Sequence, residues 1–185
     1  MLDQIKNLIP AYAKDLKLNL SSLMREEKLT VTQRTGVLFA SALAARNSSL
    51  IFLTETEARE TIDDSAEIEN AKAANAIMGM TNIYYRFLHM AKDKEYGAMP
   101  AGLRMNAVGN PPADKVNFEL YSLAVSAING CEFCVAAHDD QLKKAGLNRE
   151  AIQQAIRIAS TVHAIAAVLD GEEALSGSVG ARAAA

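Results

Sequence analysis

Three features of the 185-residue sequence predict an all-α fold. Apolar residues recur at helical spacing, as in the last third of the chain, where Ile152, Ile156 and Ala159 share one face. Residues typical of helix ends, such as Pro10 and Asn148, separate these stretches. No alternating run of β-branched residues, the usual sign of a strand, is present in the sequence.

End residues place the individual helices along the chain. Pro10 suits a first helical turn because its missing N–H has no intrahelical partner there. Gly146 suits a helix end, and Asn148 suits the start of the next helix, with Glu150 in its first turn. Helices are predicted, in order, over Leu2–Leu8, Pro10–Met24, a third that begins at Thr32 or Val31 and runs to Arg46, Ser48–Thr61, Ser65–Lys92, Val116–Ile128, Cys131–Gly146 and Asn148–Asp170.

One irregular stretch divides these helices into two groups. Segment Asp93–Pro112 holds three glycines and three prolines, and it is either a plain connection, a wall of the active site or an oligomer contact. The prediction is a single helical domain over residues 1–170, with pseudo-halves at about 1–92 and 112–170. Residues 171–185 are rich in Gly, Ser and Ala and are predicted to form a disordered tail.

The two halves contain a weak internal repeat. The small-residue run Ala40–Ala42 matches Val125–Ala127, each with a central serine. The repeat predicts that one half keeps the fold while the other carries the chemistry. This register places Arg34 opposite Glu119, Arg46 opposite Cys131 and Ser49 opposite Cys134.

Composition argues against nucleic-acid and membrane partners. The net charge is −3, with 19 basic and 22 acidic residues and 5% aromatics, and no Lys/Arg cluster recurs on a helix face. The longest uncharged run, Ala73–Tyr85, has 13 residues, too few to span a bilayer. The first residues lack the apolar core of a signal peptide. A cytoplasmic location is expected.

The most informative motif is the CxxC sequence Cys131–Cys134, which holds both cysteines of the chain and is followed by His138. It comes directly after the turn dipeptide at 129–130, so Cys131 is expected near the N-terminus of a helix. Positions i, i+3 and i+7 fall on one helix face. Both thiols and the imidazole are therefore predicted to share a face.

The spacing of the two cysteines suits a redox-active pair of thiols. The thiolate is the reactive form, and a free thiol with a pKa near ~8.5 is mostly protonated at neutral pH. The positive end of a helix and a neighbouring imidazolium both favour the anion. One thiolate can then reduce a substrate while the other closes a disulfide. The alternatives are a structural disulfide and a zinc site, although the chain has no second CxxC or HxxxH pair.

Glu119 is the second candidate for the site. It lies twelve residues before Cys131 and is the only charged residue between Lys115 and Glu132. A carboxylate in so apolar a stretch is either buried, in which case it needs a partner, or exposed on the polar side of an amphipathic helix.

Glu119 followed by Cys131-x-x-Cys134-x-x-x-His138 resembles the signature of the alkyl hydroperoxidase AhpD family. The segments 10–22, 74–80, 102–106 and 125–131 are also similar to stretches of actinobacterial members. The resemblance implies an all-helical homotrimer without a tightly bound cofactor or a metal. It implies an antioxidant enzyme that reduces hydroperoxides and oxidised peroxiredoxin AhpC. Dihydrolipoyl groups on a 2-oxoacid dehydrogenase component would re-reduce its disulfide.

The resemblance also implies a role for each site residue. Cys134 would attack the peroxide, Cys131 would resolve the sulfenic acid and form mixed disulfides with partners, and Glu119 with His138 would relay protons. The helix dipole by itself favours Cys131 as the more acidic thiol, whereas His138 favours Cys134. The chain departs from well-known members at Phe133, where they carry a histidine, so no role of that histidine transfers.

Two other functions remain open at this level. A carboxymuconolactone decarboxylase would share the helical superfamily but would need no cysteine pair. A non-catalytic thiol sensor or scaffold would show no turnover with peroxide and a thiol reductant. His163 is predicted to be a core histidine, with a role near the thiols as the alternative, because it falls on the apolar stripe of the last helix.

Overall fold

The computed structural model describes residues 2–183, and the side chains of residues 2–176. The described chain is helical and contains no strand, which confirms the predicted all-α class. Its α-helices are α1 (Leu2–Leu8), α2 (Lys14–Leu23), α3 (Val31–Ala45), α4 (Ser48–Thr61), α5 (Ser65–Met90), α6 (Asn106–Gly109), α7 (Lys115–Asn129), α8 (Glu132–Lys144) and α9 (Arg149–Ala183), with 3-10 helices η1 (Ala11–Ala13) and η2 (Lys94–Ala98).

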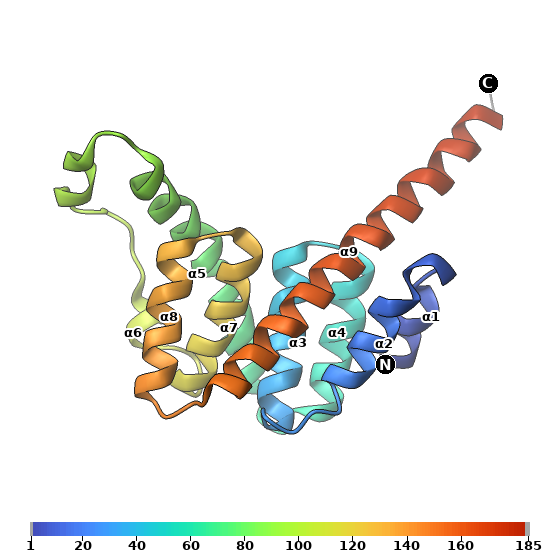
Figure 1. The fold of residues 1–185 in the computed structure, drawn as a ribbon, viewed down its shortest axis with the longest axis horizontal. Coiled ribbons are helices and arrows are strands. Elements are labelled where there is room, and N and C mark those ends of the chain that lie inside the picture. Colours follow the sequence, from blue (N-terminus) through green and yellow to red (C-terminus); the bar gives the residue numbers. More distant parts are fainter. Residues whose placement is uncertain (1, 184–185) are drawn as a thin grey trace.

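Helix α3 lies at the centre of the molecule and packs against α4, α5, α7 and α9. Its side chains explain this position, because nine of the ten residues from Thr35 to Ala44 are buried, and most of these are small or apolar. Helices α5, α7 and α8 form one side of the body, and α1, α2 and α4 form the other (Figure 1). The ends of α5 and α9 project from the body in different directions (Figure 1).

The helix caps reveal a repeat with a constant spacing of 84 residues. Thr30 and Asp114 cap α3 and α7 with side-chain oxygens, and Arg46 and Gly130 end these helices in the left-handed conformation, each with φ 68°. Asn47 and Cys131 then cap α4 and α8, and Asp64 and Asn148 cap α5 and α9. The predicted internal repeat is therefore present in the order and spacing of the helices.

The predicted register of that repeat is wrong by one residue. Matching three small residues paired Arg46 with Cys131, whereas the caps pair Asn47 with Cys131. Small residues recur often in these helices, so a three-residue match fixes no register, but a cap marks a helix end. In the corrected register Thr35, Leu50 and Thr54 take the places of Glu119, Cys134 and His138. At these matched positions, the carboxylate, the thiol and the imidazole occur in the second half alone.

A buried carboxylate joins the start of α5 to the start of α7. Glu67 accepts hydrogen bonds from the backbone N–H of Asp114 at 3.1 Å, from the Asn117 amide at 3.0 Å and from the Tyr121 hydroxyl at 3.0 Å. Burial, together with the Glu67 carboxylate, raises the pKa of Tyr121 above its ordinary value, so its hydroxyl keeps the proton that it donates. With a fourth bond from the Asn70 amide at 3.2 Å, this buried carboxylate is satisfied and holds the helices in register.

A second polar cluster joins the same helices near the CxxC motif. Asn82 of α5 donates to Ser126 of α7 at 3.0 Å, and Asn129 donates to Asn82 at 3.0 Å. Arg86 donates to the backbone carbonyl of Asn129 at 2.7 Å. The last turn of α7, which leads into the cysteines, is therefore fixed against α5.

The structure differs from the sequence predictions in two places along α9. The segment 171–185 was predicted to be a disordered tail, but α9 continues through it to Ala183. Ala and Glu favour helix in this segment, and Tyr12 donates a hydrogen bond to Glu172 at 2.9 Å. Residues 184–185 lie outside the described residues. His163 is exposed rather than in the core. The buried face runs through Ile158, Val162 and Ile165, and His163 lies one position beyond it.

In the described part of the chain, α9 is the one helix that is long and apolar enough to cross a membrane by length and composition. Half of the most apolar 18-residue stretch of α9 is buried in the protein, and α9 packs against α2, α3 and α7. The buried face of α9 thus belongs to the core of the protein.

Candidate active site

The turn between α7 and α8 sets the position of the cysteines. Gly130 has a φ of 68°, a conformation that glycine adopts without strain. Its N–H donates to the carbonyl of Ala127 at 3.2 Å, and the N–H of Cys131 donates to that of Ser126 at 3.1 Å. This pair of bonds is the Schellman motif, which ends α7 and allows α8 to begin at the next residue.

Cys131 and Cys134 are joined in a disulfide, with Cα atoms 5.3 Å apart. Cys131 is the N-cap of α8, as the sequence predicted, and its Sγ accepts a hydrogen bond from the N–H of Cys134 at 3.3 Å. Cys131 has no exposed surface, whereas Cys134 is 5% exposed. The two sulfurs thus lie at the positive end of a helix, which favours a thiolate when the pair is reduced.

Glu119 and His138 form a buried pair. Nδ1 of His138 lies 2.6 Å from Oε2 of Glu119, and both side chains are less than a tenth exposed. Glu119 is therefore buried with a partner, which settles the two alternatives that the sequence left open. An ionised carboxylate only accepts hydrogen bonds, so the tautomer of His138 that pairs with ionised Glu119 is the one with its hydrogen on Nδ1. The contact with Glu119 orients the ring and leaves Nε2 on the side of Met78.

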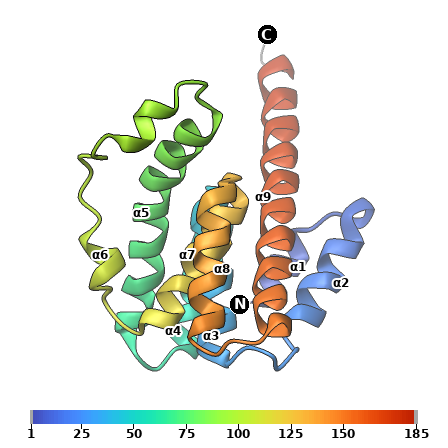
Figure 2. The ribbon, with the colours of Figure 1, turned by 60° about the vertical axis from the view of Figure 1, so that its left-hand side comes forward.

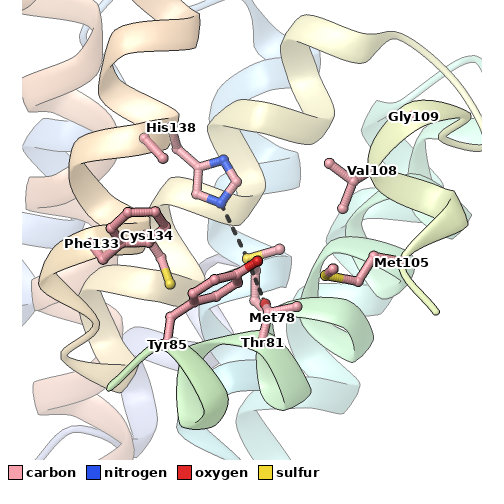
Figure 3. A pocket seen from close by; sticks show the side chains of 10 residues that line it. Met78, Thr81, Tyr85, Met105, Val108, Gly109, Phe133, Cys134 and His138 are labelled. Atoms are coloured by element: carbon pink, nitrogen blue, oxygen red, sulfur yellow. Dashed lines mark hydrogen bonds between the residues drawn. The ribbon is translucent and has the colours of Figure 1, made fainter. Parts of the chain in front are cut away.

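A cavity of about 450 Å³ lies beside Cys134 and His138. Its other walls are apolar or weakly polar side chains from α5, α6 and the residue before α6, among them Met78, Tyr85, Met105 and Val108 (Figure 3). Nε2 of His138 faces this cavity and lies 3.2 Å from Sδ of Met78 (Figure 3). Cys134 and the Nε2 atom of His138 therefore border the same apolar cavity. Such an environment suits a site for acid–base chemistry.

Phe133 is a wall of this cavity. Its ring stacks on that of Tyr85 with centroids 5.0 Å apart, and 57% of the residue is exposed. The position that holds histidine in well-known relatives thus adds an apolar surface here and no titratable group. Among the described residues, the lining of this cavity contains one histidine, His138.

The structure brings together all four site residues that the sequence predicted, and it adds others. The irregular segment Asp93–Pro112 was predicted to be a connection, an active-site wall or an oligomer contact; it supplies a wall through Met105, Val108 and Gly109. Met78 and Tyr85 were missed. No sequence pattern marks the contact of Met78 with a histidine 60 residues away.

No group of three or more His, Cys, Asp or Glu side chains that could hold a metal occurs within residues 2–176. Both cysteine sulfurs of the predicted motif are bonded to each other. The chemistry that this arrangement offers is thiol–disulfide exchange with a histidine to move protons.

Comparison with known proteins gives consistent similarities. The sequence profile of the carboxymuconolactone decarboxylase family matches residues 94–176, which include the CxxC motif. The alkyl hydroperoxide reductase AhpD of Maricaulis maris is 53% identical over 171 residues, covering 92% of this chain and 98% of that protein. Proteins of the same name from Brucella anthropi and Streptomyces coelicolor are 48% and 47% identical, covering 93% and 95% of this chain and 98% of each relative.

Proposed function

Because the chain belongs to the AhpD family of alkyl hydroperoxide reductases, we propose that it is an antioxidant enzyme that reduces hydroperoxides with its CxxC dithiol. The observation that carries the proposal is the buried Glu119–His138 pair, whose histidine lines the same cavity as Cys134. A structural disulfide would need neither a buried base nor a cavity beside one sulfur.

The oxidative half-reaction begins at Cys134. Its thiolate attacks one peroxide oxygen, the O–O bond breaks, and the products are a sulfenic acid on Cys134 and an alkoxide. The alkoxide takes a proton and leaves as the alcohol. The thiol of Cys131 then attacks the sulfenic sulfur, which forms the disulfide and releases water.

His138 supplies the protons in this scheme. It accepts the proton of the Cys134 thiol and returns it to the departing alkoxide, and Glu119 stabilises the imidazolium that forms between these steps. The carboxylate holds Nδ1, so Nε2 is the nitrogen that exchanges protons with groups in the cavity. This pair is a proton relay of two residues, without a contribution from position 133.

The disulfide must be re-reduced in each cycle. We propose dihydrolipoyl groups of a lipoylated 2-oxoacid dehydrogenase component as the reductant, and oxidised AhpC as a second acceptor of electrons from the dithiol. Cys131 is the residue proposed to form the mixed disulfide. A homotrimer in the cytoplasm completes the proposal. This set of partners follows from the family resemblance.

A coupled assay tests the proposed function. Purified protein is mixed with cumene hydroperoxide and dihydrolipoamide, and consumption of both is followed with Cys131→Ser and Cys134→Ser variants as controls. Turnover that each substitution abolishes is expected. Wild-type protein that consumes no peroxide under these conditions contradicts the proposal.

The match to the decarboxylase family profile keeps a second function in view. A decarboxylase of this fold would not need the cysteines. Conversion of a muconolactone-type substrate that survives loss of both cysteines would favour this second function over the first.

A further inference from the structure

Helix α8 separates two cavities, one on each flank. The cavity described above, here the α5-side cavity, lies between α8 and α5 with α6. A second one of about 530 Å³, here the α9-side cavity, lies between α8, α7 and α9. Figure 2 shows α8 between α5 and α9. Both volumes are in the range of ligand pockets, roughly 300–1,000 Å³.

Each cavity is lined by a different cysteine of the disulfide. Cys134 lines the α5-side cavity together with His138, and Cys131 lines the α9-side cavity. We propose that the peroxide enters on the α5 side and that the reducing dithiol binds in the α9-side cavity, where it attacks Cys131. This inference rests on the proposed function and assigns its second substrate to a separate site.

The geometry of thiol–disulfide exchange supports this assignment. The attacking sulfur approaches along the S–S axis, opposite the sulfur that leaves. An attack on Cys131 from the α9 side therefore expels the Cys134 thiolate toward the α5-side cavity, where His138 can protonate it. An attack on Cys134 would instead expel the Cys131 thiolate toward the α9-side cavity, whose described lining residues include no histidine to protonate it.

The walls of the α9-side cavity indicate the class of reductant. Leu123, Val135, Ile152 and Ile156 make most of the lining apolar. Because Cys131 has no exposed surface, a slender aliphatic arm fits this route better than a cysteine on a folded partner. A dihydrolipoyl group has such an arm, with two thiols at its end.

The charges at the cavity edge favour a neutral arm. Glu132 and Asp139 belong to the lining. Asp139 is paired with Lys143, whereas the Glu132 side chain is 83% exposed and lies 3.5 Å from the exposed His89. A carboxylate on the donor would meet Glu132, so an amide-linked dihydrolipoyl group is favoured over free dihydrolipoate.

The electrons and atoms balance in two exchanges. One thiolate of the donor bonds to Sγ of Cys131, the Cys131–Cys134 bond breaks, and Cys134 leaves as a thiolate that takes a proton. The second donor thiolate attacks the donor sulfur of this mixed disulfide and releases Cys131 as a thiolate. The donor becomes a cyclic disulfide, and the protein regains two thiols.

Two adjacent alanines give a matched test. Ala136 lines the α9-side cavity and Ala137 lines the α5-side cavity, and both are exposed residues of α8. The variants Ala136→Phe and Ala137→Phe fill one cavity each. The half-reactions are followed separately by rapid quench, thiol alkylation and mass spectrometry, with dihydrolipoamide on oxidised protein and cumene hydroperoxide on reduced protein. Circular dichroism checks the fold.

Ala136→Phe is expected to slow reduction by dihydrolipoamide roughly tenfold or more, with oxidation changed less than about twofold. Ala137→Phe is expected to give the reverse pattern. If Ala137→Phe slows reduction while Ala136→Phe does not, or if the two variants behave alike, the separate site does not exist. A wild-type disulfide that dihydrolipoamide does not reduce contradicts the proposed function as well, so the two failures are distinguishable.

Donor charge gives a second, independent readout. Wild-type protein is expected to react faster with dihydrolipoamide than with dihydrolipoate. Glu132→Gln should reduce this preference roughly two- to fivefold, the scale of an exposed charge contact. An unchanged preference would show that the donor does not pass this edge.

Discussion

Nδ1 of His138 and Oε2 of Glu119 lie 2.6 Å apart in the interior of the protein. The two residues are 19 positions apart in the sequence and belong to different helices, α8 and α7. The opposite ring nitrogen, Nε2, is thereby directed at the cavity that Cys134 also lines. An acid–base pair that is held rigidly on one side and open on the other is suited to move protons to and from a thiol.

Removing either member of this pair should slow peroxide reduction roughly 10²-fold or more, the usual scale for general acid–base participation. Glu119→Gln keeps the shape and removes the charge, and His138→Phe keeps an apolar ring on α8. The thiolate absorbance of Cys134, titrated in a Cys131→Ser background, measures the electrostatic effect directly. If neither substitution moves that titration or the rate, the relay does not operate and the helix N-terminus alone tunes the thiols.

The two cysteines should cycle between dithiol and disulfide. Their Cα atoms are 5.3 Å apart on one turn of helix, so both states fit the same backbone. Treatment of the reduced protein with one equivalent of peroxide should remove two hydrogens from the peptide that contains both residues, as measured by mass spectrometry. Two thiols that persist under mild oxidation would contradict this, as would stoichiometric zinc bound through them.

Phe133→Ala should weaken the preference for bulky apolar peroxides. The substitution removes the ring that stacks on Tyr85 at 5.0 Å and lines the cavity. An aromatic contact of this kind contributes about 0.5–1.5 kcal/mol, so the ratio of kcat/KM for cumene hydroperoxide to that for hydrogen peroxide should fall roughly 2- to 10-fold. Phe52→Ala is the matched control, because Phe52 is 67% exposed and lies outside the cavity.

Gly36→Ala should destabilise the protein, whereas Gly79→Ala should not. A Cβ at Gly36 would overlap the buried ring of Tyr121, and overpacking of this kind costs about 1–3 kcal/mol. A Cβ at Gly79 meets no atom within 4 Å, and Ala is favoured over Gly inside a helix by roughly 0.5–1 kcal/mol. Urea unfolding at fixed protein concentration measures both. Equal stabilities of the two variants would show that α3 and α7 are not packed this closely.

The protein should be a trimer in solution. Apolar side chains are exposed along the projecting end of α5 and beyond it, at Ile83, Phe87, Met90 and Met99, and burial against other copies would remove this surface from water. Light scattering should report about three times the chain mass of 19.9 kDa. A monomer at micromolar concentration would contradict the expected assembly.

Most of the helical framework could be predicted because its signals are local. A cap residue or a periodic apolar face acts within a few residues, so the positions of Thr61 and Cys131 at helix ends follow from their neighbours. The register of the internal repeat was wrong by one residue, because a match of three small residues carries too little information to set it. The exposure of His163 was missed for a related reason: α9 buries a stripe only one position away, and which side faces α3 depends on packing.

The sequence by itself determined that Cys134 and His138 lie one turn apart on the same face of α8, because residues i and i+4 of a helix are neighbours, and that Cys131 stands at the start of this helix. Only the tertiary structure decided that Glu119 meets His138, that Met78 and Tyr85 close the space beside Cys134, and that a second cavity reaches Cys131. These relationships join separate helices. They depend on how α5, α7 and α9 pack around α8, which no local pattern encodes.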